Sequence, residues 1–572
     1  MTSAVRKRLS ICGRLALATS FMVAAASFDL SGQAPRPSPR EWSSGGRLIP
    51  EQAAYDVFFY DLALRVSPSD STIDGALTAY VTVTRPLSQF VLDLDTVFAV
   101  HSVTDLSGGG KHPLPVERRG GRIWMRLLAP LRPGAELVVR VEYGGRPRIA
   151  LRPPWIGGFQ WARTADGSPW IATTCVNEGA DIWWPVKDHP SDKPDSVSLH
   201  FTVPRGLVVA SNGQPRGQRE NADSTTTFNW TVTTPISNYE VALNVAPYRV
   251  LGRTYTSTSG YAIPVTYFVL PENVEKGERL LDEIVAHLSF FEHLLGPYPF
   301  RADKYGVVET PHLGMEHQTI IAYGNGYRLN PEGYDELHQH ELSHEWFGNL
   351  ITARDWSDYW LHEGFGSYMQ PLYAEKLGGK AAYRTVIARL RAGIKNKYPV
   401  APRGPLTAGE VYFEPPDYLN STGDMYGKGA VVLHTLRGLL GDRLFFQLLR
   451  RWLYPTPDWE RLTDGSQVRL VDTDQFVHLA EQMAKRKLGW FFTVYVRQPA
   501  LPKLVVSRGA GQVSLRWETP GRLPFPMPIE VEVAGQRRRV EMPNGHATIR
   551  VRPDAAVTID PDRWVLRDEK GG

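Results

Sequence analysis

The residues best suited to chemistry lie in the stretch HQHELSHEWFGN, residues 338–349, which packs three histidines and two glutamates together. On an α-helix four residues advance the chain by about 400°, so His340 and His344 would share one face, about 6 Å apart along the axis. Imidazoles at this spacing can bind one metal ion, and a glutamate directly after the first histidine completes the pattern His-Glu-x-x-His. The sequence therefore predicts a metal site here.

The helix that carries this motif is predicted to begin near Asn330 and Pro331, because asparagine is a good N-cap and proline suits the first turn. Three apolar residues would share the face of the motif: Leu337, Phe347 and Ile351. They would direct its polar groups inward, where an unpaired charge is costly and a metal ion removes that cost. Because His338 has no histidine four residues later, we interpret it and Glu345 as ordinary polar residues of the helix.

A third ligand is predicted at Glu363, in the stretch DYWLHEGFGSYMQ, after eighteen intervening residues and on a second, antiparallel helix. Zinc hydrolase sites take three protein ligands and leave the fourth position to water. His340, His344 and Glu363 therefore predict one zinc ion per chain. The alternative is a charged helix face without metal, and a chance His-Glu-x-x-His in a chain of this composition has a probability of roughly 2%.

The rest of the chain shows two kinds of periodicity. In ALTAYVTVT, residues 76–84, apolar and polar residues alternate with a period of two, as in strands with one buried face. Helical spacing begins near residue 274, and Gly296 with Pro297 ends the first helix. Alternation returns after residue 498. These patterns predict an N-terminal β domain, a mainly helical domain and a small β-sandwich, at 51–252, 253–498 and 499–572.

The N-terminus has the pattern of a secretory signal. A basic start at residues 6–8 precedes an apolar stretch, residues 15–26, that is too short to span a bilayer comfortably. We predict a signal peptide at 1–26, a Pro-rich spacer at 27–50, and export to the periplasm or out of the cell. A retained membrane anchor or a buried N-terminal helix is the alternative.

Composition limits the function classes. A length of 572 residues predicts several domains, and 42% hydrophobic with 22% charged residues excludes disordered and fibrous classes. The 64 basic and 60 acidic residues are too balanced to indicate a nucleic-acid partner. We expect no stable membrane partner after signal cleavage. Cys12 lies inside the signal, so a cleaved chain would keep only Cys175 and form no internal disulfide.

HELSHEWFGNLIT and WLHEGFGSY together resemble the zinc aminopeptidases of the aminopeptidase N family, gluzincins that include leukotriene hydrolase/aminopeptidase. Three further segments agree in order and spacing: LGMEHQTI at 313–320, MYGKGAVVLHTL at 425–436 and WWPVKDHPSDKPD at 183–195. They resemble the exopeptidase motif Gly-x-Met-Glu-Asn, the segment with the catalytic tyrosine and the end of the β domain. The resemblance implies a multidomain α+β fold: an N-terminal β saddle, a thermolysin-like, mainly helical catalytic domain and a C-terminal β-sandwich.

The resemblance also implies a role for each residue of the site. His340, His344 and Glu363 would hold the zinc ion. Glu341, next to a ligand but angled away from it, would be the general base that takes a proton from the attacking water. Tyr426 would donate a hydrogen bond to the oxyanion.

The exopeptidase segment would bind substrate through Gly314, Met315, Glu316 and His317. Glu316 would bind the free α-ammonium of the peptide and so fix cleavage after its first residue. Leu313 replaces the first Gly of the motif and His317 its Asn. Val176 stands where the β domain of the family supplies Gln or Glu, and Glu178 is the nearest acid. We expect His317, once protonated below a pH of about 6.5, to compete for the Glu316 carboxylate.

These observations predict an exported zinc aminopeptidase of peptide catabolism, acting on peptides with a free N-terminus. A related zinc hydrolase with endopeptidase activity is an alternative that only the altered amine-binding residues favour. A non-catalytic peptide-binding domain is a second alternative, which the presence of all five core residues opposes. The sequence, which ends after the predicted sandwich without the large helical domain of many relatives, leaves the preferred N-terminal residue and the oligomeric state open.

Overall fold

The computed structural model of the chain describes residues 43–415, 418, 420–509 and 511–569, which belong to one compact unit. The predicted signal peptide and most of the predicted spacer lie outside the described residues. Within the described ranges no helix has the length and apolar character needed to cross a bilayer.

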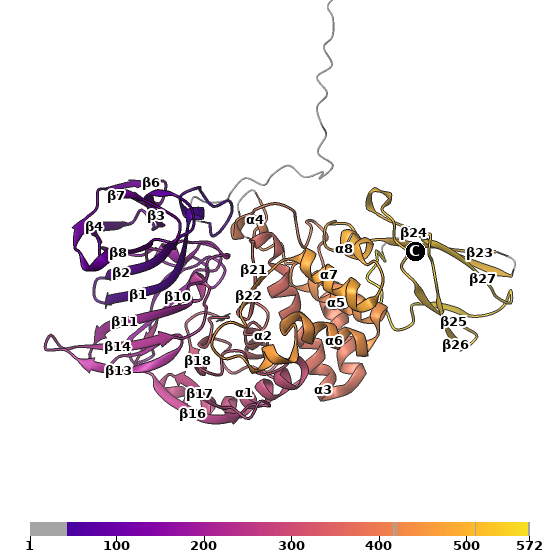
Figure 1. Cartoon of the computed structure of the whole chain (residues 1–572). Coiled ribbons are helices and arrows are strands. Elements are labelled where there is room, and N and C mark those ends of the chain that lie inside the picture. The colour runs from indigo at the N-terminus through magenta and orange to yellow at the C-terminus, as the bar shows by residue number, and fades with distance from the viewer. Residues whose placement is uncertain (1–42, 416–417, 419, 510, 570–572) are drawn as a thin grey trace, which may run out of the picture. The chain divides into compact units, whose positions relative to one another are not determined.

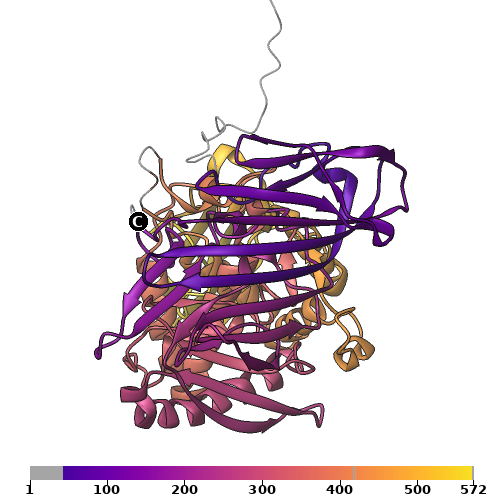
Figure 2. The ribbon, with the colours of Figure 1, turned by 90° about the vertical axis from the view of Figure 1, so that its left-hand side faces the viewer.

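The N-terminal region consists of strands (Figure 1; Figure 2). Its largest sheet has, in spatial order, β13 (Gln214–Glu220), β14 (Thr225–Val232), β11 (Ser196–Pro204), β1 (Tyr55–Ser67), β2 (Thr72–Val83), β8 (Glu136–Gly145), β4 (Phe98–Asp105) and β5 (His112–Pro113). A second has β12 (Val208–Ala210), β15 (Asn244–Ala246), β10 (Pro169–Thr174) and β9 (Gly158–Arg163), and a third β3 (Leu87–Asp93), β7 (Arg122–Leu131) and β6 (Val116–Arg119). Along β2, Leu77, Ala79, Val81 and Val83 are fully buried, which confirms the predicted alternation.

A five-stranded sheet connects this region to the helices. Its spatial order is β16 (Arg249–Thr256), β17 (Ala262–Val269), β18 (Tyr305–Glu309), β20 (Ile321–Tyr323) and β19 (Gly314–Met315). β17, β18 and β20 are parallel, whereas β19 pairs antiparallel with β20. β19 is thus an edge strand. A short parallel pair is formed by β21 (Ile351–Ala353) and β22 (Arg469–Val471).

Helices dominate the middle of the chain. They are α1 (Val274–Leu295), α2 (Glu336–Ser343), α3 (Trp360–Ala392), α4 (Ala408–Tyr412), α5 (Gly427–Leu440), α6 (Asp442–Leu453), α7 (Thr473–Ala484) and α8 (Gly489–Tyr495). The C-cap of α1 is Gly296, as the sequence predicted. Its φ of 111° is a backbone conformation that glycine adopts readily and other residues rarely adopt.

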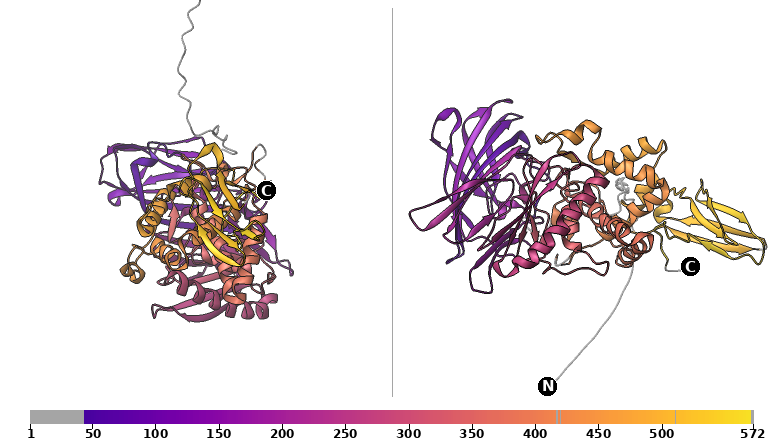
Figure 3. Two further views of the ribbon diagram at one scale, coloured as in Figure 1. Left: turned by 90° about the vertical axis from the view of Figure 1, so that its right-hand side faces the viewer. Right: turned by 90° about the horizontal axis from the view of Figure 1, so that it is seen from below.

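Two three-stranded sheets close the chain (Figure 3). One has β23 (Lys503–Gly509), β24 (Gln512–Glu518) and β27 (His546–Arg550), the other β26 (Gln536–Val540), β25 (Ile529–Val533) and β28 (Val557–Ile559). The segment after β28 packs on the helices, where the Trp564 ring stacks on His434 of α5 with a centroid distance of 4.6 Å. The predicted multidomain α+β class is confirmed, and the exact domain limits stay predictions.

The predicted start of the motif helix is wrong. Asn330 begins a turn, in which Gly333 N donates to Asn330 O (3.0 Å) and Gly333 adopts a φ of 87°. α2 begins five residues later, after Asp335, whose Oδ1 accepts from His338 N (3.0 Å) and forms the N-cap. The glycine favours a left-handed turn that a helix cannot contain.

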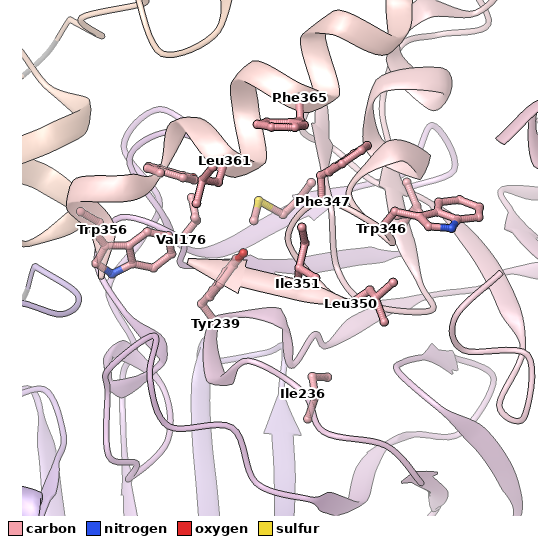
Figure 4. Close-up of a cluster of buried hydrophobic side chains, with 14 of the residues drawn as sticks. Val176, Ile236, Tyr239, Trp346, Phe347, Leu350, Ile351, Trp356, Leu361 and Phe365 are labelled. Atoms are coloured by element: carbon pink, nitrogen blue, oxygen red, sulfur yellow. The ribbon is translucent and has the colours of Figure 1, made fainter. Parts of the chain in front are cut away.

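Of the three apolar residues predicted to share one face of the motif helix, only Leu337 lies in α2. α2 ends at Ser343, so Phe347 and Ile351 lie in the segment that follows it. Both are buried, and the Phe347 ring packs on Phe365 of α3 with a centroid distance of 5.0 Å (Figure 4). These residues therefore hold the end of α2 against α3 rather than extending the helix.

Candidate active site

Three side chains from two helices converge on one point. His340 of α2, His344 at its C-cap and Glu363 in the first turn of α3 form the one group of three or more potential ligands found in the described part of the chain. The two histidine Nε2 atoms are 3.2 Å apart, and Glu363 Oε2 lies 3.5 Å and 3.6 Å from them. The sequence predicted this set.

These distances fit zinc. Donor atoms at about 2.0–2.1 Å from a tetrahedral ion lie about 3.3 Å from one another, close to the three separations observed. Glu363 Oε2 is buried and has no hydrogen-bond partner among the described residues, as expected for an atom reserved for a metal. His344 Nδ1 lies 2.9 Å from Phe347 O; donation to this carbonyl leaves Nε2 as the metal-binding atom.

The pKa shifts of the buried histidine and carboxyl groups also favour binding of zinc at this point. Burial lowers the pKa of His340 to about 4, which keeps its imidazole neutral and able to coordinate. Burial raises the pKa of Glu363, against the lowering effects of His344 and of hydrogen bonds from Tyr426 and Tyr359. Glu316, Glu341 and Glu363 thus share a buried space that a divalent cation would stabilise.

Glu341 lies beside the donor set but faces the edge strand. A Cβ atom on Gly314 of β19 would meet Glu341 Oε1 at 2.6 Å, so only glycine allows this approach. Burial, followed by repulsion from Glu316 and Glu363, raises the pKa of Glu341 well above its usual range. A carboxylate with a raised pKa is a stronger proton acceptor, which suits a general base.

Tyr426 is brought to the site by a close contact between two helices. It is the residue before α5, and its ring lies 6.2 Å from the His340 ring, centroid to centroid. α3 and α5 meet at Gly364 and Gly429, where a Cβ on Gly429 would come within 2.8 Å of Gly364 Cα. Burial raises the pKa of the Tyr426 hydroxyl well above its usual value, so it stays a hydrogen-bond donor.

Glu316 follows the edge strand and reaches the same space. It is 5% exposed, and burial raises its pKa to about 7. Tyr239 from the N-terminal region donates a hydrogen bond to its Oε1 atom (3.4 Å). No ion pair of Glu316 with a lysine or arginine occurs among the described residues. Its carboxylate is therefore free to accept a cationic group of a ligand.

A cavity of about 640 Å³ joins these groups. Its walls include the three ligands, Glu341, Tyr426 and the edge-strand residues Gly314, Met315 and Glu316. The N-terminal region contributes Pro154, Trp155, Val176 and Asn177. The predicted set is thus gathered at one cavity, apart from the residues described next.

His317 does not line this cavity. Its side chain is fully buried, and burial lowers its pKa to about 3. The expectation that it protonates near pH 6.5 and competes for Glu316 is therefore wrong. Glu178 does not replace the missing acid at Val176 either, because its Oε2 accepts from Gly157 N (2.8 Å) away from the cavity wall.

His338 and Glu345 are not ordinary surface residues of the helix. Both are fully buried. The ring nitrogens of His338 lie 2.8 Å from His287 Nδ1 and 2.8 Å from the Tyr305 hydroxyl. Glu345 accepts from Thr319 N (2.8 Å), and burial raises its pKa to about 8. They anchor α2 in the interior, which the local pattern could not reveal.

Sequence reasoning did not name several residues of the cavity, among them Tyr359 and Arg328. Tyr359 lines it and lowers the pKa of Glu363 by hydrogen bonding, and its place four residues before Glu363 was the available signal. Arg328 lines it from the loop between β20 and α2. Nothing in the spacing of Arg328 pointed to the site.

The fold and this donor set define a zinc metallopeptidase type of site. Residues 281–493 match the family model described as Peptidase family M1 domain. An M1 zinc metallopeptidase of Deinococcus radiodurans, in a mutant form bound to a Tyr-Ser-Ala substrate, superposes with a TM-score of 0.60 at 25% identity, covering 79% of this chain and 96% of that chain.

Curated relatives point the same way. Human endoplasmic reticulum aminopeptidase 1 is 24% identical over 73% of this chain and 45% of its own length. Human aminopeptidase N is 27% identical over 50% of this chain and 31% of its own length. Residues 281–493 are thus similar to the catalytic domain of peptidase M1 zinc metallopeptidases, and His340, His344 and Glu363 fit the one zinc ion that this similarity implies. The chain spans less than half the length of these two relatives.

Proposed function

We propose that the protein is a zinc aminopeptidase that hydrolyses the first peptide bond of peptides with a free N-terminus. The observation that carries this proposal is the buried Glu316 carboxylate, which lies without a cationic side-chain partner in the same cavity as the zinc ligands. A similar M1 zinc metallopeptidase, that of Deinococcus radiodurans, is bound to a Tyr-Ser-Ala substrate in a mutant form. Buried carboxylates are stabilised by a cation, and the α-ammonium group supplies one.

Metal binding and proton transfer would be carried out by different side chains. His340, His344 and Glu363 would hold zinc, which polarises a carbonyl and lowers the pKa of a water to about 7. Glu341 would take a proton from the attacking water and deliver it to the leaving amine. Its position against β19 keeps the carboxylate next to a peptide laid along that strand.

Tyr426 would stabilise the charge that develops on the carbonyl oxygen. A buried donor aimed at an oxyanion contributes on the order of 100-fold or more to the rate. Because burial raises its pKa, the hydroxyl keeps its proton at any working pH. The donor is therefore in place before the charge appears.

Glu316 would set the cleavage position. Binding of the α-ammonium group at this carboxylate places the first peptide bond next to the zinc ligands, and a blocked amine removes the charge on which binding depends. We expect acetylation of the substrate N-terminus to lower kcat/KM by roughly 100-fold or more. Glu316→Ala should lower kcat/KM on free peptides and leave zinc content unchanged.

The test compares free and N-acetylated peptides with the wild type and Glu316→Ala, with zinc measured by elemental analysis. Equal cleavage of free and acetylated peptides, or internal cuts as the first products of a long peptide, would refute the aminopeptidase proposal. Those results would favour the endopeptidase alternative. The altered position at Val176 makes this comparison necessary.

We propose, on the sequence pattern of residues 1–26, that the protein is exported to the periplasm or secreted. The mature chain would begin near residue 27. Mass spectrometry of the protein isolated from its own cells should find this new N-terminus. An intact Met1 on cytosolic protein would overturn the proposal.

A further inference from the structure

A second tyrosine lies beside Tyr426 in the wall of the cavity. Tyr412, the last residue of α4, lines the cavity and is buried. Its ring lies 6.3 Å from the Tyr426 ring, centroid to centroid, at an angle of 84°, and the two side chains share a hydrogen bond. The backbone joins the same two places, because Thr422 N, four residues before Tyr426, donates to Tyr412 O (2.8 Å). Tyr412 is therefore a direct neighbour of the Tyr426 hydroxyl.

This neighbour matters because an oxyanion donor must be held at one point before the charge develops. Glu363, the other hydrogen-bond partner of Tyr426, belongs to the metal site. A hydrogen bond from the Tyr412 hydroxyl to the Tyr426 oxygen would leave the Tyr426 proton free for the substrate. Hydrogen bonds in a chain polarise one another, so this contact would also make Tyr426 a stronger donor.

The position of Tyr412 depends on α4, a helix of only five residues. Isolated helices shorter than about 12 residues are marginal in water, so contacts with the rest of the molecule must fix α4. The first backbone N–H groups of a helix also need acceptors outside its own turns. Thr407, the N-cap, satisfies the N–H of Glu410 through a capping box. The two N–H groups before Glu410 find their acceptors elsewhere.

Those acceptors come from residues 43–46, which we call the anchoring segment. Ala408 N donates to Ser44 O (2.9 Å), and Gly409 N donates to Ser43 Oγ (2.9 Å). Gly45 forms an isolated antiparallel bridge with the cap residue Thr407. α4 is thus held at its N-terminus by a segment 366 residues away in the sequence.

The anchoring segment is itself fixed by the N-terminal region and by Trp356. Ser44 N donates to Asn177 O (3.1 Å), and Trp356 Nε1 donates to Ser44 Oγ (3.2 Å). The buried Trp356 ring packs on Tyr239, with a centroid distance of 5.4 Å (Figure 4). A Cβ on Gly45, whose φ is 82°, would meet Trp356 Cδ1 at 2.4 Å. The segment therefore has one position between the ring and α4.

We propose that Tyr412 is a positioning residue for Tyr426 and that the anchoring segment keeps Tyr412 in place. The inference rests on the proposed aminopeptidase function and adds two elements on which the oxyanion donor depends. Tyr412 would act on turnover through Tyr426, and not on zinc binding or on the α-ammonium group of the substrate. Loss of one such hydrogen bond is expected to lower kcat by about 10-fold.

The first experiment is a double-mutant cycle on the zinc-loaded enzyme, with one free tripeptide as substrate. Tyr412→Phe should lower kcat by about 10-fold and leave KM and zinc content unchanged. In a Tyr426→Phe enzyme the same substitution should change kcat by less than about 2-fold, because its effect passes through a hydroxyl that is already missing. A residue that only supports the fold would lower kcat equally in both backgrounds.

The second experiment changes the anchoring segment. Gly45→Ala places a Cβ against Trp356, and Ser43→Ala removes one acceptor of α4. Each should lower kcat by about 3- to 10-fold in the wild type and have little effect in a Tyr412→Phe enzyme. The matched control is Gly134→Ala in the turn between β7 and β8, which has a similar φ of 87° but whose Cβ would meet nothing within 4 Å. Its kcat should equal that of the wild type.

Ser43→Ala adds no atom and decides the question if Gly45→Ala fails to fold. Normal kcat in Tyr412→Phe, a change in KM alone, or equal losses with and without the Tyr426 hydroxyl would overturn the inference and leave the aminopeptidase proposal intact. Normal kcat in the folded variants of the anchoring segment would overturn the role of that segment. Failure of the wild type to cleave free peptides, or cleavage of internal bonds first, would instead contradict the proposed function and the inference with it.

Discussion

Glu341 directly follows a zinc ligand in sequence, yet its Oε1 atom lies against Gly314 of the edge strand and outside the donor set. This position separates its role from metal binding. We predict that Glu341→Gln keeps one zinc per chain and loses roughly 100- to 10,000-fold in kcat, the range that general bases contribute. Zinc content and kcat measured on the same sample check this.

Glu336→Gln, which changes a glutamate at the cavity rim, is the matched control and should keep most of the activity. If Glu341→Gln lost zinc and recovered activity after zinc was added back, the assignment of Glu341 as base would be wrong.

At the residue scale the sequence was informative where spacing alone determines chemistry. His340, His344 and Glu363 could be predicted because helix geometry and a known ligand number restrict the choices. The interior roles of His338 and Glu345 could not, because their partners Tyr305 and Thr319 come from distant strands and loops.

At the scale of elements, the contact between α3 and α5 places the tyrosine next to the zinc ligands. Gly429→Ala would bring a Cβ within 2.8 Å of Gly364 Cα, and the helices would have to separate. Overpacking of this kind costs about 1–3 kcal/mol. Because Tyr426 lies three residues before Gly429, we predict a loss of kcat of at least about 10-fold with zinc retained.

The control is Gly489→Ala in the first turn of α8, where a Cβ would meet nothing closer than 3.7 Å. Its kcat and thermal midpoint should stay close to those of the wild type. A Gly429→Ala enzyme with normal kcat would show that the helix contact does not position Tyr426.

The sequence predicted the end of α1 correctly but misplaced the start of α2, and each outcome has a physical reason. The end of α1 at Gly296 followed from a residue that alone tolerates its φ of 111°. The start of α2 was misplaced because Asn330 and Pro331 suit a turn as well as a helix, and Gly333 decided for the turn. Asp335 is the residue that caps α2, because its side chain accepts from His338 N.

At the scale of the whole molecule, the site joins regions far apart in the chain. Tyr239 from the N-terminal region supports Glu316, and the zinc ligands come from α2 and α3. The period of the sequence predicted the β and helical regions, but the cavity between them depends on packing that no local pattern encodes. Zinc at this junction should therefore stabilise the folded molecule as well as act in catalysis.

We predict that zinc removal lowers the thermal midpoint, Tm, and does so more at pH 8 than at pH 5. Zinc at 1,000 times its Kd adds about 4 kcal/mol to the free energy of unfolding, which for a chain of this length is about 4 °C. Without the ion, burial raises the Glu316 pKa to about 7, above its value in the unfolded chain. The folded state then binds more protons than the unfolded state, so apo stability is lost as pH rises from about 4.5 to 7.

The measurement is Tm by calorimetry, with zinc and with a chelator, at pH 5, 6.5 and 8. The difference between the zinc-loaded and chelated protein should grow across this series, because the cation offsets the repulsion among Glu316, Glu341 and Glu363 only when they are ionised. Glu316→Gln, which cannot ionise, should flatten part of the pH dependence of the chelated protein. A Tm difference that is constant with pH, or absent, would show that the ion does not stabilise the fold through these carboxylates.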